Sequence, residues 1–384
     1  MMRRLLSAAA ALCLLAACTN VSPEAAGTEH ALGANWLRPP MPGTACRVPQ
    51  GDGRMELAER GIGGTGPLTA PAAPVAKEPK PTTGIAAVIT GFGSVCLADR
   101  EVSMSPDLTV SVDGSVGAAA ELAAGQRALL VARWRHDHFD TKNIIIRHEI
   151  VGPVQRVDAG GYRLVVAGQA VTIAPNAWVE APLASGQWVA VSGLPDPEGG
   201  VLASRIDPAA AGAVLLRGRL LRDGARYAVG DLAVEGAGLA DLVGQPVTLR
   251  GSLAGDALLV AKAEPDSLVT DPAQLFGAAV RHYAIEAVVS KKGPDAMHFT
   301  VPLGMTLPAQ AEPTILGLDR TDPNGLVATS VTVAGSGFAG GDDPSRDNGI
   351  RQRGLVGGAG PLGGSAGMAA HRGASPGNGG QSGP

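Results

Sequence analysis

Aromatic and charged side chains are both scarce in this sequence. Phe, Trp and Tyr make up 3% of the 384 residues, and Asp, Glu, Lys and Arg make up 17%. So few aromatic rings argue against a stacking platform for single-stranded nucleic acid and against a rich sugar-binding surface. The formal net charge of −4 gives no electrostatic case for nucleic acid, whose partners usually carry a basic stripe. We therefore expect no nucleic-acid partner.

Long apolar runs are also scarce, and the one that stands out lies at the start of the chain. Arg3 and Arg4 precede an apolar run at residues 5–15, and small residues come next at 16–17. A basic start, a short apolar stretch and a small-residue cleavage site are typical of an export signal. The run is too short for a permanent membrane span, and no other stretch is long and apolar enough to be one. We expect residues 1–18 to be a signal peptide.

The end of this signal carries the motif Leu-Ala-Ala-Cys at 15–18, which resembles a bacterial lipobox. The resemblance implies that Cys18 is lipid-modified and becomes the first residue of the mature chain. Several acyl chains on one cysteine make an effectively permanent anchor, because each buried methylene adds about 0.8 kcal/mol. By the same resemblance, Thr19 in place of Asp favours the outer membrane, facing the periplasm, over the inner membrane. An ordinary secretory signal that happens to contain a cysteine is the alternative.

Cysteine is rare, with only four in the chain. Cys13 lies within the signal and Cys18 is the predicted lipid site, which leaves Cys46 and Cys96. These two could pair in an oxidising envelope compartment, where the bridge would contribute about 4 kcal/mol by chain entropy. Two buried free thiols are the alternative, and the geometry of the two positions decides between them.

Glycine and proline, by contrast, are abundant, at 54 and 29 residues. The Pro-rich residues 19–83 favour an extended, semi-rigid tether, which could hold the central part of the chain up to ~200 Å from the bilayer. Residues 335–384 are rich in Gly, Ser and Pro with few apolar side chains, so we expect a disordered tail. Between these two segments, turn residues separate short apolar runs, which predicts many short strands rather than long helices.

The central part of the sequence is a repeat. A Gly-Gln step before an apolar strand occurs at Gly125, Gly186 and Gly244, at intervals of about 60 residues. Tight-hairpin signals such as Asp113-Gly114 separate about five short strands per unit. Five short antiparallel strands that close on themselves form a small OB-like barrel, and closure removes exposed sheet edges. We predict an all-β chain with barrels at 84–150, 151–210 and 211–265, then a connector with a degenerate fourth repeat at 266–334.

Short glycine-rich segments in this region carry a family resemblance. They read Gly-Ile-Gly-Gly-Thr-Gly at 61–66 and Ile-Thr-Gly-Phe-Gly-Ser-Val at 89–95. Together with the Val-Asp-Gly turn at 112–114 and the Leu-x-x-Gly-Gln step, they resemble the tandem envelope repeats of domain of unknown function 5666. The resemblance is best over residues 61–150 and extends over 151–265. It implies a repeat architecture and an envelope location, and it brings no activity, cofactor or catalytic residue.

One short segment concentrates possible metal ligands. His136 and His138, with Asp137 and Asp140 beside them, lie in the expected hairpin loop of the first barrel. Two histidines separated by one residue project to the same side of a strand and could hold Zn or Cu. A polar loop tip without a function is the alternative, because no cysteine and no second His-rich segment lies nearby in the sequence.

The other polar residues form no catalytic pattern. His148 alternates with isoleucines, which predicts a barrel-rim or core histidine satisfied by backbone rather than a catalytic base. No Gly-x-Ser-x-Gly elbow occurs, and no phosphate-binding loop ends in Lys-Ser or Lys-Thr. Arg217, Arg219 and Arg222 are interpreted as solvated strand and turn residues.

The sequence leaves three hypotheses open, of which a hydrolase that uses clefts between barrels rests only on the abundance of Ser and Asp and is not pursued. The first is a non-enzymatic, lipid-anchored envelope protein without a cofactor, in which a row of barrels offers surfaces to another envelope protein or a cell-wall polymer. The alternative is a periplasmic metal-binding or metal-sensing lipoprotein that uses the loop of His136 and His138.

Overall fold

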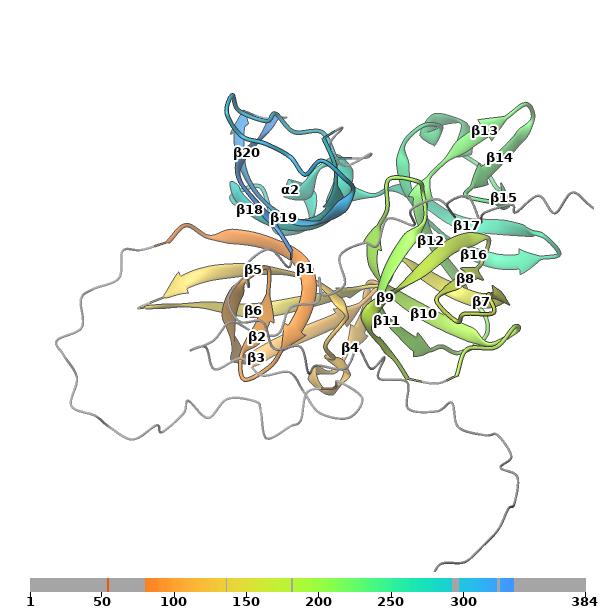
Figure 1. Ribbon diagram of the computed structural model, residues 1–384, viewed down its shortest axis with the longest axis horizontal. Helices are drawn as coiled ribbons and strands as arrows, with labels where there is room; N and C mark the ends of the chain where they lie inside the picture. The colour runs from red at the N-terminus through yellow and green to blue at the C-terminus, as the bar shows by residue number, and fades with distance from the viewer. Residues whose placement is uncertain are drawn as a thin grey trace, which may run out of the picture.

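The computed structural model describes Arg54 and residues 80–135, 137–180, 182–291, 297–322 and 325–334. The predicted signal peptide, the tail at 335–384 and nearly all of the tether at 19–83 lie outside the described residues. Among the helices in the described ranges, none is long and apolar enough to cross a bilayer. The central part of the chain is built mainly of β-strands in closed barrels, which confirms the predicted fold class (Figure 1).

The first barrel closes in the order β1-β2-β3-β6-β5-β1, with β3 and β6 parallel and the other neighbours antiparallel. Five short strands that close in this way form the OB-like barrel predicted from the sequence, with one parallel pair among the expected antiparallel ones. Its interior is apolar, with fully buried Ile85, Ile89 and Ile146. The hairpin at Asp113-Gly114 has both residues at positive φ, as the Asp-Gly signal predicts. The strands are β1 (Thr83–Gly91), β2 (Val95–Leu97), β3 (Arg100–Val112), β4 (Ser115–Gly117), β5 (Arg127–Arg135) and β6 (His138–Arg147).

The second barrel repeats this topology, closing in the order β7-β8-β9-β11-β10-β7 with β9 and β11 parallel. Gly168 lies at its boundary with the third barrel, where a Cβ at that position would lie 2.6 Å from the Leu232 Cβ. The cores of the second and third barrels are therefore continuous. The strands are β7 (Ile150–Val157), β8 (Arg163–Val166), β9 (Gln169–Val179), β10 (Trp188–Pro195) and β11 (Val201–Pro208).

The third barrel has the same order, but its first strand is interrupted at Leu220 and counts as two, β12 and β13. β13 pairs with β14 at one end and β12 with β16 at the other, while β15 and β17 are parallel. β12 also pairs with β7, so one hydrogen-bonded sheet runs through the second and third barrels. The strands are β12 (Val214–Arg219), β13 (Leu221–Asp223), β14 (Arg226–Val229), β15 (Leu232–Glu235), β16 (Pro246–Ala254) and β17 (Ala257–Pro265).

The Gly-Gln step has the same structural role in all three barrels. Gly125, Gly186 and Gly244 have φ of +87°, +86° and +79°, a conformation that favours glycine. Each of these glycines donates its N–H to one residue of the first strand of its barrel, and that residue donates its own N–H to the carbonyl of the next glutamine. The first-strand residues are Ile89, Val154 and Leu220, and the N···O distances of these hydrogen bonds are 2.7–3.0 Å. The repeated dipeptide thus closes each barrel between its fourth and first strands.

The fourth unit is a three-stranded sheet rather than a barrel. β18 (His282–Val289), β19 (Glu312–Asp322) and β20 (Gly325–Val333) form an antiparallel meander, preceded by the short helices α1 (Ser267–Thr270) and α2 (Pro272–Phe276). β18 returns to the first barrel and pairs with β1 in parallel. This unit lacks the Gly-Gln step, and its three described strands do not close.

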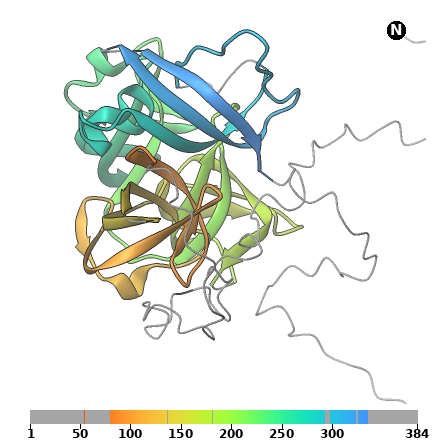
Figure 2. The same cartoon turned by 90° about the vertical axis from the view of Figure 1, so that its left-hand side faces the viewer.

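The four units surround a common centre instead of standing in a row (Figures 1 and 2). Figure 1 shows the first barrel below the C-terminal sheet, and the second barrel below the third. Val88 of the first barrel, Leu194 and Leu202 of the second, and Val288 of the C-terminal sheet form one buried apolar cluster. The expected row was wrong on this point, because the chain turns back on itself through the β1–β18 pairing.

Candidate functional site

Buried charged side chains connect the units of the molecule. We call this cluster the ionic junction. Arg147 lies at its centre, with two guanidinium nitrogens 2.9 and 3.2 Å from the Glu149 carboxylate and two 2.9 and 2.5 Å from the Asp266 carboxylate. A second cation, Arg127, lies 2.9 Å from Glu149. The ionic junction consists of Arg127, Arg147, Glu149 and Asp266, with the adjoining group Asp113, His148 and Arg217.

Glu149 is the residue on which three barrels meet. Its side chain binds the arginines of the first barrel, while its backbone N–H donates to Val191 O of β10 at 2.8 Å. Its carbonyl accepts from Arg217 N of β12 at 3.0 Å. The side chain is 1% exposed. Because Glu149 is bound by the first, second and third barrels at once, the ionic junction fixes the orientation of these barrels.

The electrostatics of the junction favour the charged form of Glu149. Burial raises the pKa of Glu149, but the positive charges of Arg147 and Arg127 outweigh burial and lower that pKa to about 2. Burial lowers the pKa of Arg217 to about 10, with repulsion from Arg147 acting in the same direction. The ion pairs are therefore intact at neutral pH.

The ring of His148 pairs with a side-chain carboxylate, whereas the sequence predicted that backbone would satisfy it. Its Nδ1 lies 2.7 Å from Asp113 Oδ2, and its backbone N–H donates to Asp113 Oδ1 at 3.1 Å. Arg217 donates to the same carboxylate at 3.0 Å, and its side chain is 8% exposed. The interpretation of His148 as a structural rim histidine agrees with this burial. The interpretation of Arg217 as a solvated residue was wrong, because its partner Asp113 lies in a different barrel.

A second buried cluster joins the first and second barrels to the N-terminal segment. Arg205, with a fully buried side chain, pairs with Asp207 and Glu180 and donates to Ala124 O of the first barrel. Arg54 lies 2.9 Å from Glu180 and forms a backbone bridge with Ala123. Burial raises the pKa of Glu180, and the neighbouring Asp207 carboxylate raises it further. Arg54 therefore joins the N-terminal part of the chain to the first and second barrels.

The predicted metal loop is a hairpin tip between β5 and β6. Asp137 and His138 lie there, with side chains 70% and 51% exposed and 3.1 Å between Oδ1 and Nδ1. Asp140 pairs with Arg135 at 2.8 Å instead of pointing to His138. His136 lies outside the described residues, and the described ones contain no group of three His, Cys, Asp or Glu that could hold a metal. The metal site stays a prediction.

The predicted cysteine chemistry is only partly visible. Cys96, in β2, is 4% exposed and is disulfide-bonded. It is the one cysteine in the described residues, so its partner lies outside them, as do Cys46 and the predicted lipid site Cys18. The pairing of Cys96 with Cys46 stays a prediction.

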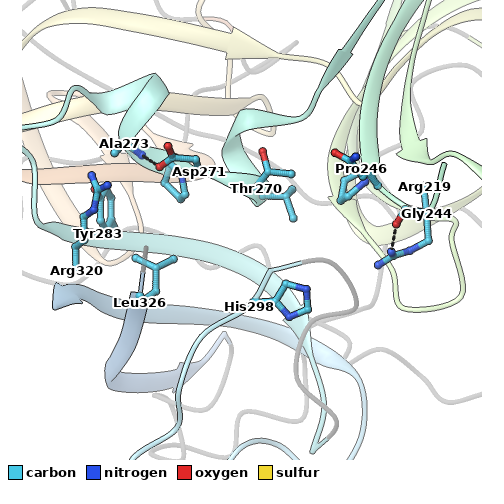
Figure 3. Close-up of a pocket in the computed structure, with 14 residues that line it drawn as sticks. Arg219, Gly244, Pro246, Thr270, Asp271, Ala273, Tyr283, His298, Arg320 and Leu326 are labelled. Atoms are coloured by element: carbon cyan, nitrogen blue, oxygen red, sulfur yellow. Dashed lines mark hydrogen bonds between the residues drawn. The ribbon is translucent and has the colours of Figure 1, made fainter. Parts of the chain in front are cut away.

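Among the described residues, two clefts lie where units meet. The larger, about 710 Å³, lies between β3 to β6 of the first barrel and α2, and it combines apolar Val116 and Leu275 with polar Asn143 and Gln274. The smaller, about 410 Å³, lies between the third barrel and the C-terminal sheet (Figure 3). Both are in the size range of ligand sites. The sequence could not indicate either cleft, because each is assembled from units far apart in the chain.

A comparison with known families agrees with the repeat. Residues 151–207 match the model of a family described as Domain of unknown function (DUF5666). The match begins one residue after the start of β7 and ends one residue before the end of β11, so it covers the second barrel. The resemblance was expected to be best over residues 61–150, and the family model instead matches the next unit along the chain. No curated protein and no solved structure gives a significant match.

Proposed function

We propose that this chain is a lipid-anchored envelope protein whose barrels form a rigid binding scaffold. The ionic junction carries the proposal. Its buried arginines and carboxylates bind one another across the barrels, so their role is to hold the units in fixed positions. A fixed arrangement keeps the clefts between units preformed, which lowers the entropic cost of binding a partner. The partner is an envelope protein or a cell-wall polymer.

The lipid on Cys18 would display this scaffold from the outer membrane into the periplasm. Because Arg54 contacts the barrels, the chain between Cys18 and Arg54 sets how far they reach. At about 3.1 Å per residue in extended form, that segment spans at most about 110 Å. The scaffold would thus act within about 110 Å of the membrane surface.

Acyl labelling in cells tests the anchor with a matched pair of variants. In Cys18→Ser the acyl site is removed, and we expect the protein to incorporate no labelled palmitate. Cys13→Ser, which changes a cysteine within the apolar signal run, should incorporate the label as the unaltered chain does. Incorporation of the label by Cys18→Ser would contradict the lipid anchor.

Photo-crosslinking in intact cells tests the binding role. A crosslinker at Val116, 99% exposed in the larger cleft, should give a discrete adduct. The control is Tyr162, 48% exposed in the β7–β8 turn of the second barrel. We expect no such adduct there. Failure to trap any specific partner at Val116, or equal trapping at both positions, would contradict the scaffold.

The metal hypothesis remains a second candidate because Asp137 and His138 lie together and exposed at the β5–β6 hairpin tip. It would make the chain a periplasmic Zn- or Cu-binding lipoprotein. Elemental analysis of the purified chain beside His136→Ala/His138→Ala tests it. Equal metal content in the two proteins would exclude a metal at this loop.

A further inference from the structure

The smaller cleft has the charge and shape of a site for an acidic ligand. Figure 3 shows its side chains around an open space, with Arg320 and Tyr283 at one end and Arg219 at the other. Thr270 and Asp271, from the α1–α2 segment, lie along one side, and His298 lies on the opposite side. The two arginines come from different units, since Arg219 ends β12 and Arg320 lies in β19.

Hydrogen-bond donors dominate the polar lining. Each guanidinium is a permanently charged fork of donors that suits a carboxylate or a phosphate. One oxygen of the lining carboxylate is engaged within the protein, because Asp271 Oδ1 accepts from Ala273 N at 3.2 Å as a helix cap. Arg219 Nη1 donates to Gly244 O, and its guanidinium carries further N–H donors. The Tyr283 hydroxyl donates to Val280 O at 2.7 Å. A donor-rich cleft favours a ligand that brings acceptors, which an anion does.

Apolar residues complete the wall. Val269, Pro272 and Leu326 line the same cleft. A volume of about 410 Å³ suits a small molecule better than a polymer chain. The chain as a whole carries a net charge of −4, so its overall field does not attract anions and binding must come from these local cations.

We infer that the cleft between the third barrel and the C-terminal sheet binds a small organic acid or phosphate ester, whose acidic groups pair with Arg219 and Arg320 while its body packs on Val269, Pro272 and Leu326. Such a ligand bridges the two units that the backbone does not pair directly. The inference does not depend on the lipid anchor or on a macromolecular partner, so its failure and the failure of the proposed scaffold are distinguishable.

Calorimetric titration of the full chain tests the site with citrate, inorganic phosphate and the uncharged control glycerol, at low ionic strength. We expect saturable one-to-one binding of citrate, phosphate or both, and none of glycerol. The double variant Arg219→Gln/Arg320→Gln should weaken anion binding at least about tenfold. Binding of citrate alone would assign the site to carboxylates, and binding of phosphate alone to phosphate esters.

Arg222→Gln is the matched control. Arg222 donates to the carbonyl of Gly224, much as Arg219 donates to the carbonyl of Gly244, but it lies outside the cleft. Its loss should change affinity by less than about twofold, the scale of an exposed charge. Leu326→Glu keeps both arginines and places a carboxylate in the cleft, so it should also weaken anion binding.

The inference is overturned by any of three results: no anion binding up to about 10 mM, unchanged binding in the double variant, or an equal loss in Arg222→Gln. Circular dichroism of each variant establishes that it is folded.

Discussion

Replacing Glu149 by glutamine is expected to be among the most damaging single substitutions in this chain. The change keeps the shape of the side chain but removes the charge that faces Arg127 and Arg147. Breaking a buried ion pair by removing one partner costs about 3–5 kcal/mol, because the remaining charge stays buried without compensation. The same contacts lower the pKa of Glu149 from 4.5 to about 2, which corresponds to about 3 kcal/mol.

Urea unfolding, monitored both by far-UV circular dichroism and by tryptophan fluorescence, measures this loss. In the unaltered chain we expect the two signals to coincide, because the junction couples the barrels. In Glu149→Gln the midpoint should fall by the equivalent of about 3 kcal/mol or more. The two signals should also separate as the barrels unfold independently.

Glu264→Gln provides the matched control for charge loss. Glu264 lies 2.7 Å from Lys262 on the surface, with side chains 42% and 62% exposed, and such pairs are worth about 0–1 kcal/mol. A cost below about 1 kcal/mol for Glu149→Gln, or equal costs for the two variants, would refute the assignment of the junction as the element that holds the units together.

The same residue predicts a pH dependence. The pKa of Glu149 is lower in the folded chain than in the unfolded one, so its contribution is fully present above about pH 4.5 and is lost as the pH falls toward 2. In Glu149→Gln this part of the acid sensitivity should disappear. An identical acid-unfolding profile in the two proteins would show that Glu149 is not the titrating group.

Four further substitutions test the repeat and the N-terminal contact by thermal or urea unfolding. Gly125→Ala should cost several kcal/mol, because φ is +87° and the new Cβ would lie 2.7 Å from a carbonyl oxygen of β11. Gly186→Ala, at the same repeat position with open space around it, should cost only about 1 kcal/mol. Equal costs for the two variants would contradict the packing described for the first two barrels. Gln126→Ala should cost about 1–3 kcal/mol, because the side chain accepts from Ala123 N at 2.8 Å and donates to Glu121 O at 2.9 Å, and an unchanged midpoint would contradict its role in the closing turn. Arg54→Ala should cost at most about 1 kcal/mol, because this ion pair is partly exposed, and a larger loss would mean that the N-terminal contact is part of the core.

Local signals in the sequence predicted the barrels well. The Gly-Gln step and the Asp113-Gly114 hairpin specify backbone conformations that few other residues adopt. The first therefore marks the closing turn of a barrel, and the second marks a tight turn between two strands. The alternation of Ile144 and Ile146 likewise predicted a strand with one buried face, and both are at most 1% exposed. Turns and strand faces of this kind are determined by residues that are adjacent in the sequence, so they can be predicted from it.

The ionic junction and the clefts could not be predicted in the same way. Arg147 alternates with a buried face and looks like a solvent-facing charge, yet its partner Asp266 is 119 residues away. The pairing of β18 with β1 likewise has no local signal in the sequence. It places the C-terminal sheet beside the third barrel, where Arg219 and Arg320 line one cleft. Sites that depend on how whole units pack need the three-dimensional arrangement.

The mass of the N-terminal peptide from the chain isolated out of its native envelope tests the central claim most directly. A lipid-displayed scaffold predicts a mature chain that begins at Cys18 and carries acyl chains on that residue. A chain that retains residues before Cys18, or an unmodified Cys18, would contradict it.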